Sequence, residues 1–210
     1  MLIRFNNKFF THKLRINAVF IFICWLFAQP VLADIQKPLR ILLTNDDGYQ
    51  AVGITTMKQA LESTGHKVTV VAPLTQRSGS SASISLTIPS YKQINSDVWA
   101  VDATPLTCVW VGLTIILAQT PDLIVSGTNI GANLGPVAVL SGTVGGALAG
   151  VHAELAGLPG SIPAIAFNTD APMNEKKDPE GFKQHFENVA AFAVRVIELL
   201  AEGDGSLLPE

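Results

Sequence analysis

Two adjacent aspartates, Asp46 and Asp47, are the residues of this sequence best placed to do chemistry. They follow an apolar run, Leu39 to Leu43, and precede Gly48, a pattern typical of a short buried strand that ends in a turn. Neighbouring carboxylates repel each other, so we expect a compensating charge, and a hard cation such as Mg²⁺, Ca²⁺ or Mn²⁺ suits their oxygens. The alternative is that Asn45 to Gly48 forms only a tight turn, because turns prefer these residue types.

Three later segments could bring further ligands to the aspartates. Residues 75–85 contain five serines, one arginine and one glycine; such a segment is either a flexible linker or a loop that presents hydroxyls and backbone N–H groups. In the glycine- and asparagine-rich segment 126–135, Asn129 offers a neutral oxygen to a cation. Ser141 or Thr143 can cap a helix whose first-turn N–H groups form an anion site. Small residues after Thr143 would let that helix approach a sheet closely.

Strands and helices alternate around these segments. The β-branched run Val68 to Ala72 predicts a second strand, and Ile54, Met57 and Leu61 fall at helical spacing between the two strands. This βαβ unit should have a right-handed crossover. Further strands are predicted at Leu123–Val125 and Ile165–Phe167. In an open α/β sheet, ligands bind outside the carboxyl ends of the strands, where these polar segments begin.

Several other elements are expected. Leu86–Ile88 and Val98–Val101 could form an additional hairpin, and Pro105–Leu117 should be a helix with Thr104 as N-cap and Pro105 at its first position. A final helix should bury a face made of Phe182, Phe186, Val189, Ala193, Val196 and Leu200. We expect His66 to be an exposed turn residue without a catalytic role.

Residues 1–33 have the features of a secretory signal peptide. Four basic residues and no acid precede an apolar stretch, Ile16–Ala28, and Val31-Leu32-Ala33 forms a small-residue cleavage site before Asp34. We therefore expect export to the periplasm or secretion, with no membrane association after cleavage; the alternative is an uncleaved N-terminal anchor. Residues 34–210 would form one domain.

Removing residues 1–33 leaves 10 basic residues against 17 acidic ones, a net charge of −7. An acidic chain argues against a nucleic-acid polymer as partner, although not against a small phosphorylated ligand. Cys24 would leave with the signal peptide, so Cys108 would have no intrachain disulfide partner. Its apolar neighbours favour a buried inert thiol over a nucleophile.

With these segments assembled, the sequence resembles the SurE family of survival-protein nucleotidases and phosphatases. Four motifs carry the resemblance, in the family's order and spacing, between about Leu39 and Asp170. They are Ile41-Leu42-Leu43-Thr44-Asn45-Asp46-Asp47-Gly48, Arg77-Ser78-Gly79, Val125-Ser126-Gly127-Thr128-Asn129-Ile130-Gly131 with Asn133-Leu134-Gly135, and Ser141-Gly142-Thr143-Val144.

The resemblance implies a Rossmann-like α/β fold with a doubly wound, mostly parallel sheet. It implies hydrolysis of phosphomonoesters, often nucleoside 5′- or 3′-monophosphates, that requires one divalent cation, with Mg²⁺ or Mn²⁺ preferred. The partner would be a small phosphorylated substrate, and a full-length relative would be a homo-oligomer. The implied metal ligands are Asp46, Asp47, Ser78 and Asn129, and the implied phosphate-binding segment is Ser141, Gly142 and Thr143.

The sequence departs from the family pattern in two places. Residues 136–140 are wholly apolar, where family members commonly carry an acidic residue and a tyrosine. After Leu208-Pro209, family members continue into another core strand and an oligomerisation hairpin, so we expect a C-terminally incomplete sheet in a truncated domain. Two alternatives to an active phosphatase follow: a non-catalytic module that binds metal and phosphate, and an inactive fragment of a nucleotidase.

The mechanism favoured by the resemblance is metal-assisted hydrolysis. The cation would bind a phosphoryl oxygen and lower the pKa of a water molecule, and Asp46 or Asp47 could accept the proton. Covalent attack by an aspartate is the alternative. The sequence does not separate these routes, and it specifies neither the phosphomonoester nor the metal.

Overall fold

The computed structural model describes residues 37–170, 175–201 and 207. The predicted signal peptide and the last three residues lie outside these ranges. Within the described ranges, no helix is both long enough and apolar enough to cross a membrane.

The described strands form a six-stranded sheet in the order β3-β4-β2-β1-β5-β6. Every neighbouring pair is parallel except β3 and β4. The chain runs outward from central β1 to β2 on one side and from β5 to β6 on the other, which confirms the predicted Rossmann-like architecture. The strands are β1 Arg40–Thr44, β2 Lys67–Pro73, β3 Tyr91–Gln93, β4 Val98–Val101, β5 Leu123–Ile130 and β6 Ala164–Thr169.

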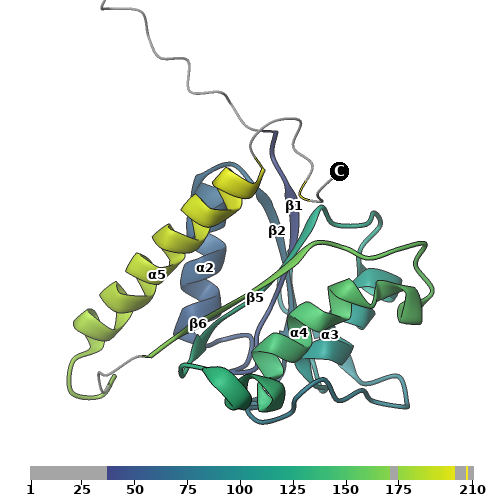
Figure 1. Ribbon diagram of the computed structural model, residues 1–210, viewed down its shortest axis with the longest axis horizontal. Coiled ribbons are helices and arrows are strands. Elements are labelled where there is room, and N and C mark those ends of the chain that lie inside the picture. Colours follow the sequence, from purple (N-terminus) through teal and green to yellow (C-terminus); the bar gives the residue numbers. More distant parts are fainter. Residues whose placement is uncertain (1–36, 171–174, 202–206, 208–210) are drawn as a thin grey trace, which may run out of the picture. The chain divides into compact units, whose positions relative to one another are not determined.

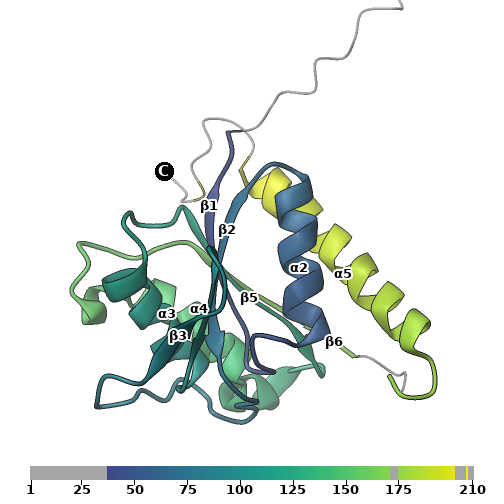
Figure 2. The ribbon, with the colours of Figure 1, turned by 180° about the vertical axis from the view of Figure 1, so that it is seen from behind.

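Helices cover both faces of the sheet. Figure 1 and Figure 2 show α2 (Val52–Ser63) and α5 (Pro179–Leu200) together on one face, with α3 (Pro105–Val111) and α4 (Gly142–Val151) on the other. A π-helical turn, Gly112–Ile116, continues α3 to one residue before the predicted helix end at Leu117. Two short 3₁₀ helices, Gly135–Leu140 and Ala153–Ala156, flank α4.

The central strand explains why two layers of helices are needed. Ile41 and Leu43 of β1 belong to the core under α2 and α5, whereas Leu42 belongs to the core under α3 and α4. A parallel strand buried on both faces reads as a continuous apolar run, which is why β1 could be predicted. Cys108 lies in the second core with no exposed surface, and burial raises the pKa of its thiol, so the predicted inert thiol is confirmed.

The predicted close approach of α4 to the sheet is confirmed. A Cβ atom added at Gly146 would lie 2.6 Å from Ser126 Oγ and 2.9 Å from Thr44 Cγ2. Real Cβ atoms are not found that close to neighbouring atoms, so only glycine allows this packing distance.

The hairpin prediction was wrong about one strand. The partner of β4 is Tyr91–Gln93, and Leu86 and Ile88 are 94% and 81% exposed. The segment before them is attached elsewhere, because Ser83 O accepts a hydrogen bond from Thr104 Oγ1 and Ser85 N–H donates one to Thr107 Oγ1. These contacts direct the chain along the start of α3, away from the edge of β4.

The predicted buried face of α5 was correct at its start and wrong at its end. Phe182, Phe186 and Ala193 are buried, but Val189 and Val196 are only partly buried and Leu200 is exposed. At about 100° per residue, the buried residues Ala190, Val194 and Ile197 lie on one side of Phe182, whereas Val189 and Val196 lie on the other, so the buried face is rotated from the predicted one. The buried positions are Phe182, Phe186, Ala190, Ala193, Val194 and Ile197.

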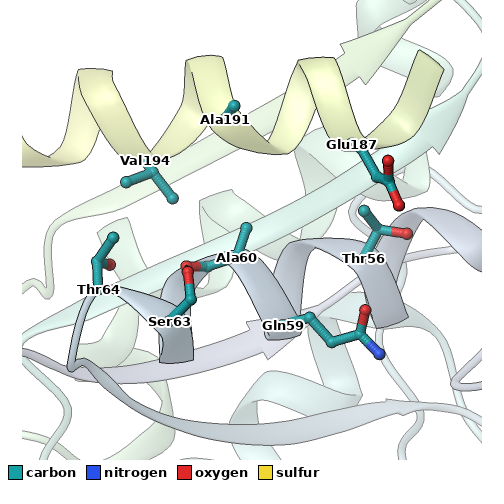
Figure 3. A pocket seen from close by; sticks show the side chains of 8 residues that line it. All are labelled: Thr56, Gln59, Ala60, Ser63, Thr64, Glu187, Ala191 and Val194. Atoms are coloured by element: carbon teal, nitrogen blue, oxygen red, sulfur yellow. The ribbon is translucent and has the colours of Figure 1, made fainter. Parts of the chain in front are cut away.

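A groove of about 410 Å³ lies between the outer surfaces of α2 and α5 (Figure 3). None of the residues predicted to bind metal or phosphate lines it. Its walls are mostly small or uncharged side chains: Thr56, Gln59, Ala60, Ser63, Thr64, Glu187, Ala191 and Val194.

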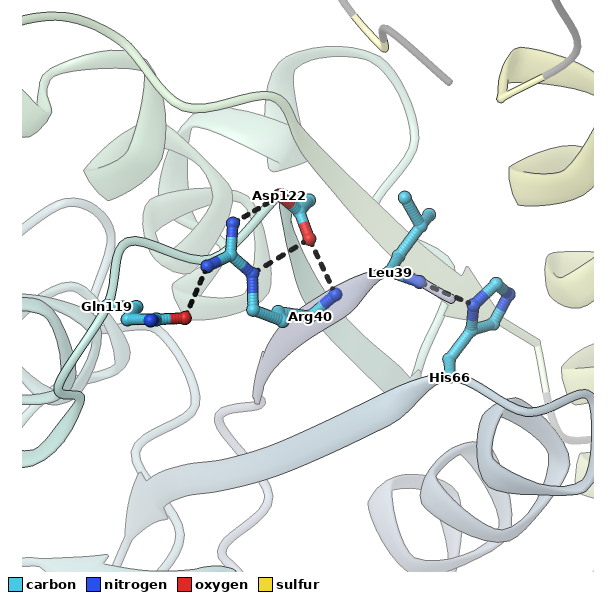
Figure 4. Close-up of polar contacts among 5 residues, drawn as sticks. All are labelled: Leu39, Arg40, His66, Gln119 and Asp122. Carbon is cyan, nitrogen blue, oxygen red and sulfur yellow. Dashed lines mark hydrogen bonds and ion pairs between the residues drawn. The ribbon is translucent and has the colours of Figure 1, made fainter. Parts of the chain in front are cut away.

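The amino-terminal edge of the sheet is held by side chains that bond to one another and to the backbone (Figure 4). Arg40 donates to Asp122 through Nε and Nη2, at 3.1 and 2.7 Å, and to Gln119 Oε1 through Nη1 at 2.7 Å. His66 is only 7% exposed, and its Nδ1 accepts a hydrogen bond of 3.2 Å from Leu39 N–H. The expectation that His66 is an exposed turn residue was therefore wrong.

Candidate functional site

The turn that follows β1 is held by Asn45 and leaves both aspartates available. Asn45 Nδ2 donates to Gly48 O at 3.0 Å, and Gly48 N–H donates to Asn45 Oδ1 at 3.2 Å. Gly48 has a φ of +103°, a conformation that favours glycine. The tight-turn interpretation is thus right for the backbone, but it does not account for the Asp46 and Asp47 side chains, which point to other elements.

Asp46 is buried against the start of α4. It is 3% exposed, and its Oδ1 accepts a hydrogen bond of 2.7 Å from Thr143 Oγ1. Burial raises the pKa of the Asp46 carboxyl, while hydrogen bonds from the Thr143 side chain and from the backbone of Thr143 and Gly142 oppose that rise.

Asp47 is half-buried and points toward the end of β5. Its Oδ2 accepts a hydrogen bond of 3.0 Å from Ile130 N–H. Burial raises the pKa of Asp47 to about 6; the charge of Asp46 adds to the rise, and hydrogen bonds from Ile130 and Gln76 oppose it. Among the described residues, the ion pairs involve other carboxylates, so no cationic side chain neutralises Asp46 or Asp47.

Asn129 is brought to the acidic pair by the same contact, because it precedes Ile130 in β5. It is buried, and its Nδ2 donates to Gly131 O at 2.9 Å, which leaves the amide oxygen as the atom suited to a cation. Within the described residues, no group of three or more His, Cys, Asp or Glu side chains could hold a metal. A cation site here would rest on two carboxylates and neutral oxygens.

The serine-rich loop is attached to the acidic pair by its backbone. Arg77 N–H donates to Asp46 O at 2.6 Å, and the Arg77 side chain forms an ion pair with Asp102. The far end of the loop is also fixed, since Ser81 N–H and Oγ donate to Leu140 O and Val139 O at 3.1 and 2.7 Å. The loop is therefore a bound element of the site and not a free linker, although the Ser78 side chain is exposed.

The predicted phosphate-binding segment forms the first turn of α4. Ser141 is the N-cap, and its Oγ accepts a hydrogen bond of 3.2 Å from Val144 N–H. Thr143 is fully buried and its hydroxyl is bonded to Asp46. A Cβ at Gly142 would lie 2.6 Å from Ser80 Oγ and 2.9 Å from Asp46 Oδ2. The structure thus brings the helix start, the aspartates and the serine-rich loop together.

The sequence interpretation missed a group of buried hydroxyls at this edge. Thr44, Ser126 and Thr128 are fully buried, and their hydroxyls, like that of Ser80, lack a hydrogen-bond partner in the described part of the chain. Thr44 and Ser126 are register partners on β1 and β5, so they face the same side of the sheet. No signal in the sequence distinguished Ser80 from the other four serines of its loop.

These features fit a hard divalent cation. Two uncompensated carboxylates supply the charge, Asn129 supplies a neutral oxygen, and hydroxyls without partners belong to the same strands and to the serine-rich loop. Buried polar groups without partners are uncommon in native proteins and call for an explanation such as an ion or a water molecule.

The fold and the site together define a Rossmann-like α/β protein with an oxygen-rich ligand site between β1 and β5, where the direction of strand order reverses. Residues 41–207 match the family model described as Survival protein SurE. The chain belongs to this family, which confirms the resemblance seen in its motifs.

Named relatives and a solved structure agree with this assignment. A 5'-nucleotidase SurE from Stenotrophomonas maltophilia (strain R551-3) is 40% identical over 163 residues, covering 77% of this chain and 58% of the relative. A 5'/3'-nucleotidase SurE from Edwardsiella ictaluri (strain 93-146) is 36% identical over 166 residues, covering 78% and 58%. The crystal structure of SurE protein from Aquifex aeolicus matches with a TM-score of 0.64 and 36% identity, covering 78% of this chain and 61% of that one. The chain therefore spans less than two thirds of the length of these proteins.

Proposed function

We propose that this chain is a cation-dependent phosphomonoester hydrolase that acts on nucleoside 5′- or 3′-monophosphates. The observation that carries the proposal is the pair of carboxylates at the switch point, buried Asp46 and half-buried Asp47, which have no cationic partner among the described residues. Membership of the SurE family and the nucleotidase names of its relatives support the reaction class.

In this proposal Asp46, Asp47, Ser78 and Asn129 hold one divalent cation, with Mg²⁺ or Mn²⁺ preferred for an all-oxygen site. When bound, such a cation neutralises phosphoryl charge and lowers the pKa of a water molecule. In this proposal Thr143 contacts the phosphate and also orients Asp46, because its hydroxyl donates a hydrogen bond to Asp46 Oδ1.

Two routes for the chemical step remain in the proposal. In the first, Asp46 or Asp47 accepts the proton of the attacking water as a general base, and the alcohol leaves phosphorus. In the second, an aspartate attacks phosphorus and displaces the alcohol by breaking its P–O bond, and water then hydrolyses the acyl phosphate to release phosphate and the free carboxylate. Trapping with hydroxylamine during turnover separates them, since only an acyl phosphate yields a hydroxamate.

A non-catalytic phosphate-binding module is the second candidate. The observation that favours it is the exposed 3₁₀ helix Gly135–Leu140 beside Ser141, which offers no acidic or tyrosine side chain to a substrate.

We also propose that the protein is exported and that Asp34 becomes its amino terminus. Amino-terminal sequencing of the exported protein tests this, and a chain that still begins at Met1 would refute it.

The test of function is turnover by the purified protein. We expect hydrolysis of an aryl phosphate and of nucleoside monophosphates in the presence of Mg²⁺ or Mn²⁺, and its loss in EDTA. Calorimetry with Mn²⁺ and inorganic phosphate should accompany the assay. Binding of both without any turnover would favour the non-catalytic module.

A further inference from the structure

Ser80 stands out among the serines of its loop because its hydroxyl is enclosed. Ser80 Oγ is buried and has no hydrogen-bond partner in the described part of the chain. The backbone fixes its position, since Ser80 N–H donates to Arg77 O at 3.2 Å and Arg77 N–H donates to Asp46 O at 2.6 Å. The hydroxyl is therefore held beside the acidic pair by two consecutive backbone contacts.

The Ser80 hydroxyl and the Asp46 carboxylate border the same space beside Gly142. A Cβ at Gly142 would meet Ser80 Oγ at 2.6 Å and Asp46 Oδ2 at 2.9 Å, so both oxygens border the one space that the glycine leaves open. The other carboxylate oxygen, Oδ1, is already held by Thr143 Oγ1. Ser80 thus lies beside the oxygen of Asp46 that Thr143 does not hold.

The enclosure of the hydroxyl limits what it can do. Because Ser80 Oγ is shielded from solvent, it does not offer itself to a substrate as a nucleophile. A change in its side-chain torsion, however, is a small movement that can turn the hydroxyl toward Asp46. Groups that hydrogen-bond a metal-binding carboxylate fix its orientation and raise its affinity for the metal.

We propose that Ser80 is a positioning residue that donates a hydrogen bond to Asp46 Oδ2 in the cation-bound protein. Together with Thr143, it holds the carboxylate by both oxygens and keeps it oriented toward the cation. This inference rests on the proposed function, because it requires that Asp46 binds a cation.

The test separates a positioning role from a structural one. Calorimetry with Mn²⁺ should show that Ser80→Ala weakens cation binding by about tenfold, the lower end of the range for such supporting groups. Without cation, the urea midpoint should stay unchanged, since the hydroxyl has no partner to lose. Ser83→Ala, an exposed serine of the same loop, is the matched control and should change neither quantity.

Asp47→Asn serves as the reference for the cation site itself. If Asp47→Asn loses Mn²⁺ affinity and Ser80→Ala keeps it within about twofold, the positioning role is overturned while the proposed cation site stands. If Asp47→Asn binds Mn²⁺ as the wild type does, the cation site itself is wrong.

A lower urea midpoint in Ser80→Ala with unchanged Mn²⁺ binding would assign Ser80 a structural role. A higher KM with unchanged Mn²⁺ binding would assign the hydroxyl to the substrate. Either result overturns the inference.

Discussion

The carboxylates at the two edges of the sheet differ in whether a cationic side chain pairs with them. At the amino-terminal edge, Arg40 and its own backbone N–H donate to Asp122, and this partner holds the pKa of Asp122 below its usual range. At the carboxyl edge, Asp46 and Asp47 have no such partner in the part of the chain that the structure describes, and burial raises the pKa of both. A carboxylate that the chain neutralises with its own cation is a structural element, whereas an uncompensated pair implies a charge supplied from outside.

The other polar groups at the two edges also differ in how many hydrogen-bond partners they have. Four buried hydroxyls without partners in the described residues, those of Thr44, Ser80, Ser126 and Thr128, belong to β1, β5 and the serine-rich loop. At the amino-terminal edge, the polar atoms of Arg40, Asp122 and Gln119 bond to one another (Figure 4). His66 Nε2, at the amino-terminal edge, is also buried without a partner in the described residues, so the difference lies in the combination of several unsatisfied hydroxyls with two uncompensated carboxylates at one edge.

The largest effect should come from Asp47→Asn. The substitution keeps the size of the side chain and removes one charge, so Mn²⁺ affinity and phosphatase rate should fall together by about a hundredfold or more, since ligand charge sets cation affinity. Calorimetry and a phosphate-release assay measure the two quantities. If Asp47 served only the turn, asparagine would fit the same backbone and neither quantity would change.

A smaller but clear loss is expected for Gly142→Ala. The added Cβ would lie 2.6 Å from Ser80 Oγ and 2.8 Å from Asp46 Cβ, so both must move. Overpacking of this kind costs about 1–3 kcal/mol of unfolding free energy, and cation affinity should fall as well. Gly160→Ala, where an added Cβ meets nothing within 4 Å, is the matched control for urea titrations. Equal stability of the two variants would contradict the crowding at Gly142.

These two predictions also show how far the sequence alone could reach. The apolar runs of β1, β2 and β5 and the polar segments after them were enough to predict one ligand-bearing edge, because the carboxyl ends of parallel strands share an edge. The close contact of Gly142 with Ser80 and Asp46 could not be predicted, since it depends on how tightly three segments that were expected at one edge pack together. His66 was missed for the same reason: its partner, Leu39 N–H, lies 27 residues away.

His66 should make the amino-terminal edge sensitive to acid. Burial lowers the pKa of His66, with the charge of Glu198 opposing this, so the folded state disfavours the protonated ring. This contribution to stability is complete above the unfolded pKa of about 6.5 and is lost as pH falls below it. Urea midpoints in EDTA at pH 7.5 and 5.5 should therefore differ more for the wild type than for His66→Asn, whose amide oxygen can still accept from Leu39. Equal pH dependence of the urea midpoint in both proteins would contradict this assignment. Any titration of Asp47 shifts the midpoint equally in both proteins and therefore cancels in the comparison.

The smallest effect is expected for Asp122→Asn. The ion pair with Arg40 is partly exposed, and such pairs contribute little because water and salt screen them. We expect Tm to fall by no more than about 3 °C at low salt, with less difference at 1 M NaCl and no change in Mn²⁺ affinity. A loss of cation binding comparable to that of Asp47→Asn would remove the contrast between the two edges.

The glycines of α4 also limit how this protein could be engineered for heat resistance. Replacing helical glycines with alanine is a common route to a more stable protein. In α4 that route is closed at the inner face, because a Cβ at Gly145 would lie 2.1 Å from Ser81 O and one at Gly146 would lie 2.6 Å from Ser126 Oγ. A stabilised variant would have to be built from other positions, such as the exposed surface of α5. The helix that approaches the candidate site most closely would keep its low intrinsic helix propensity.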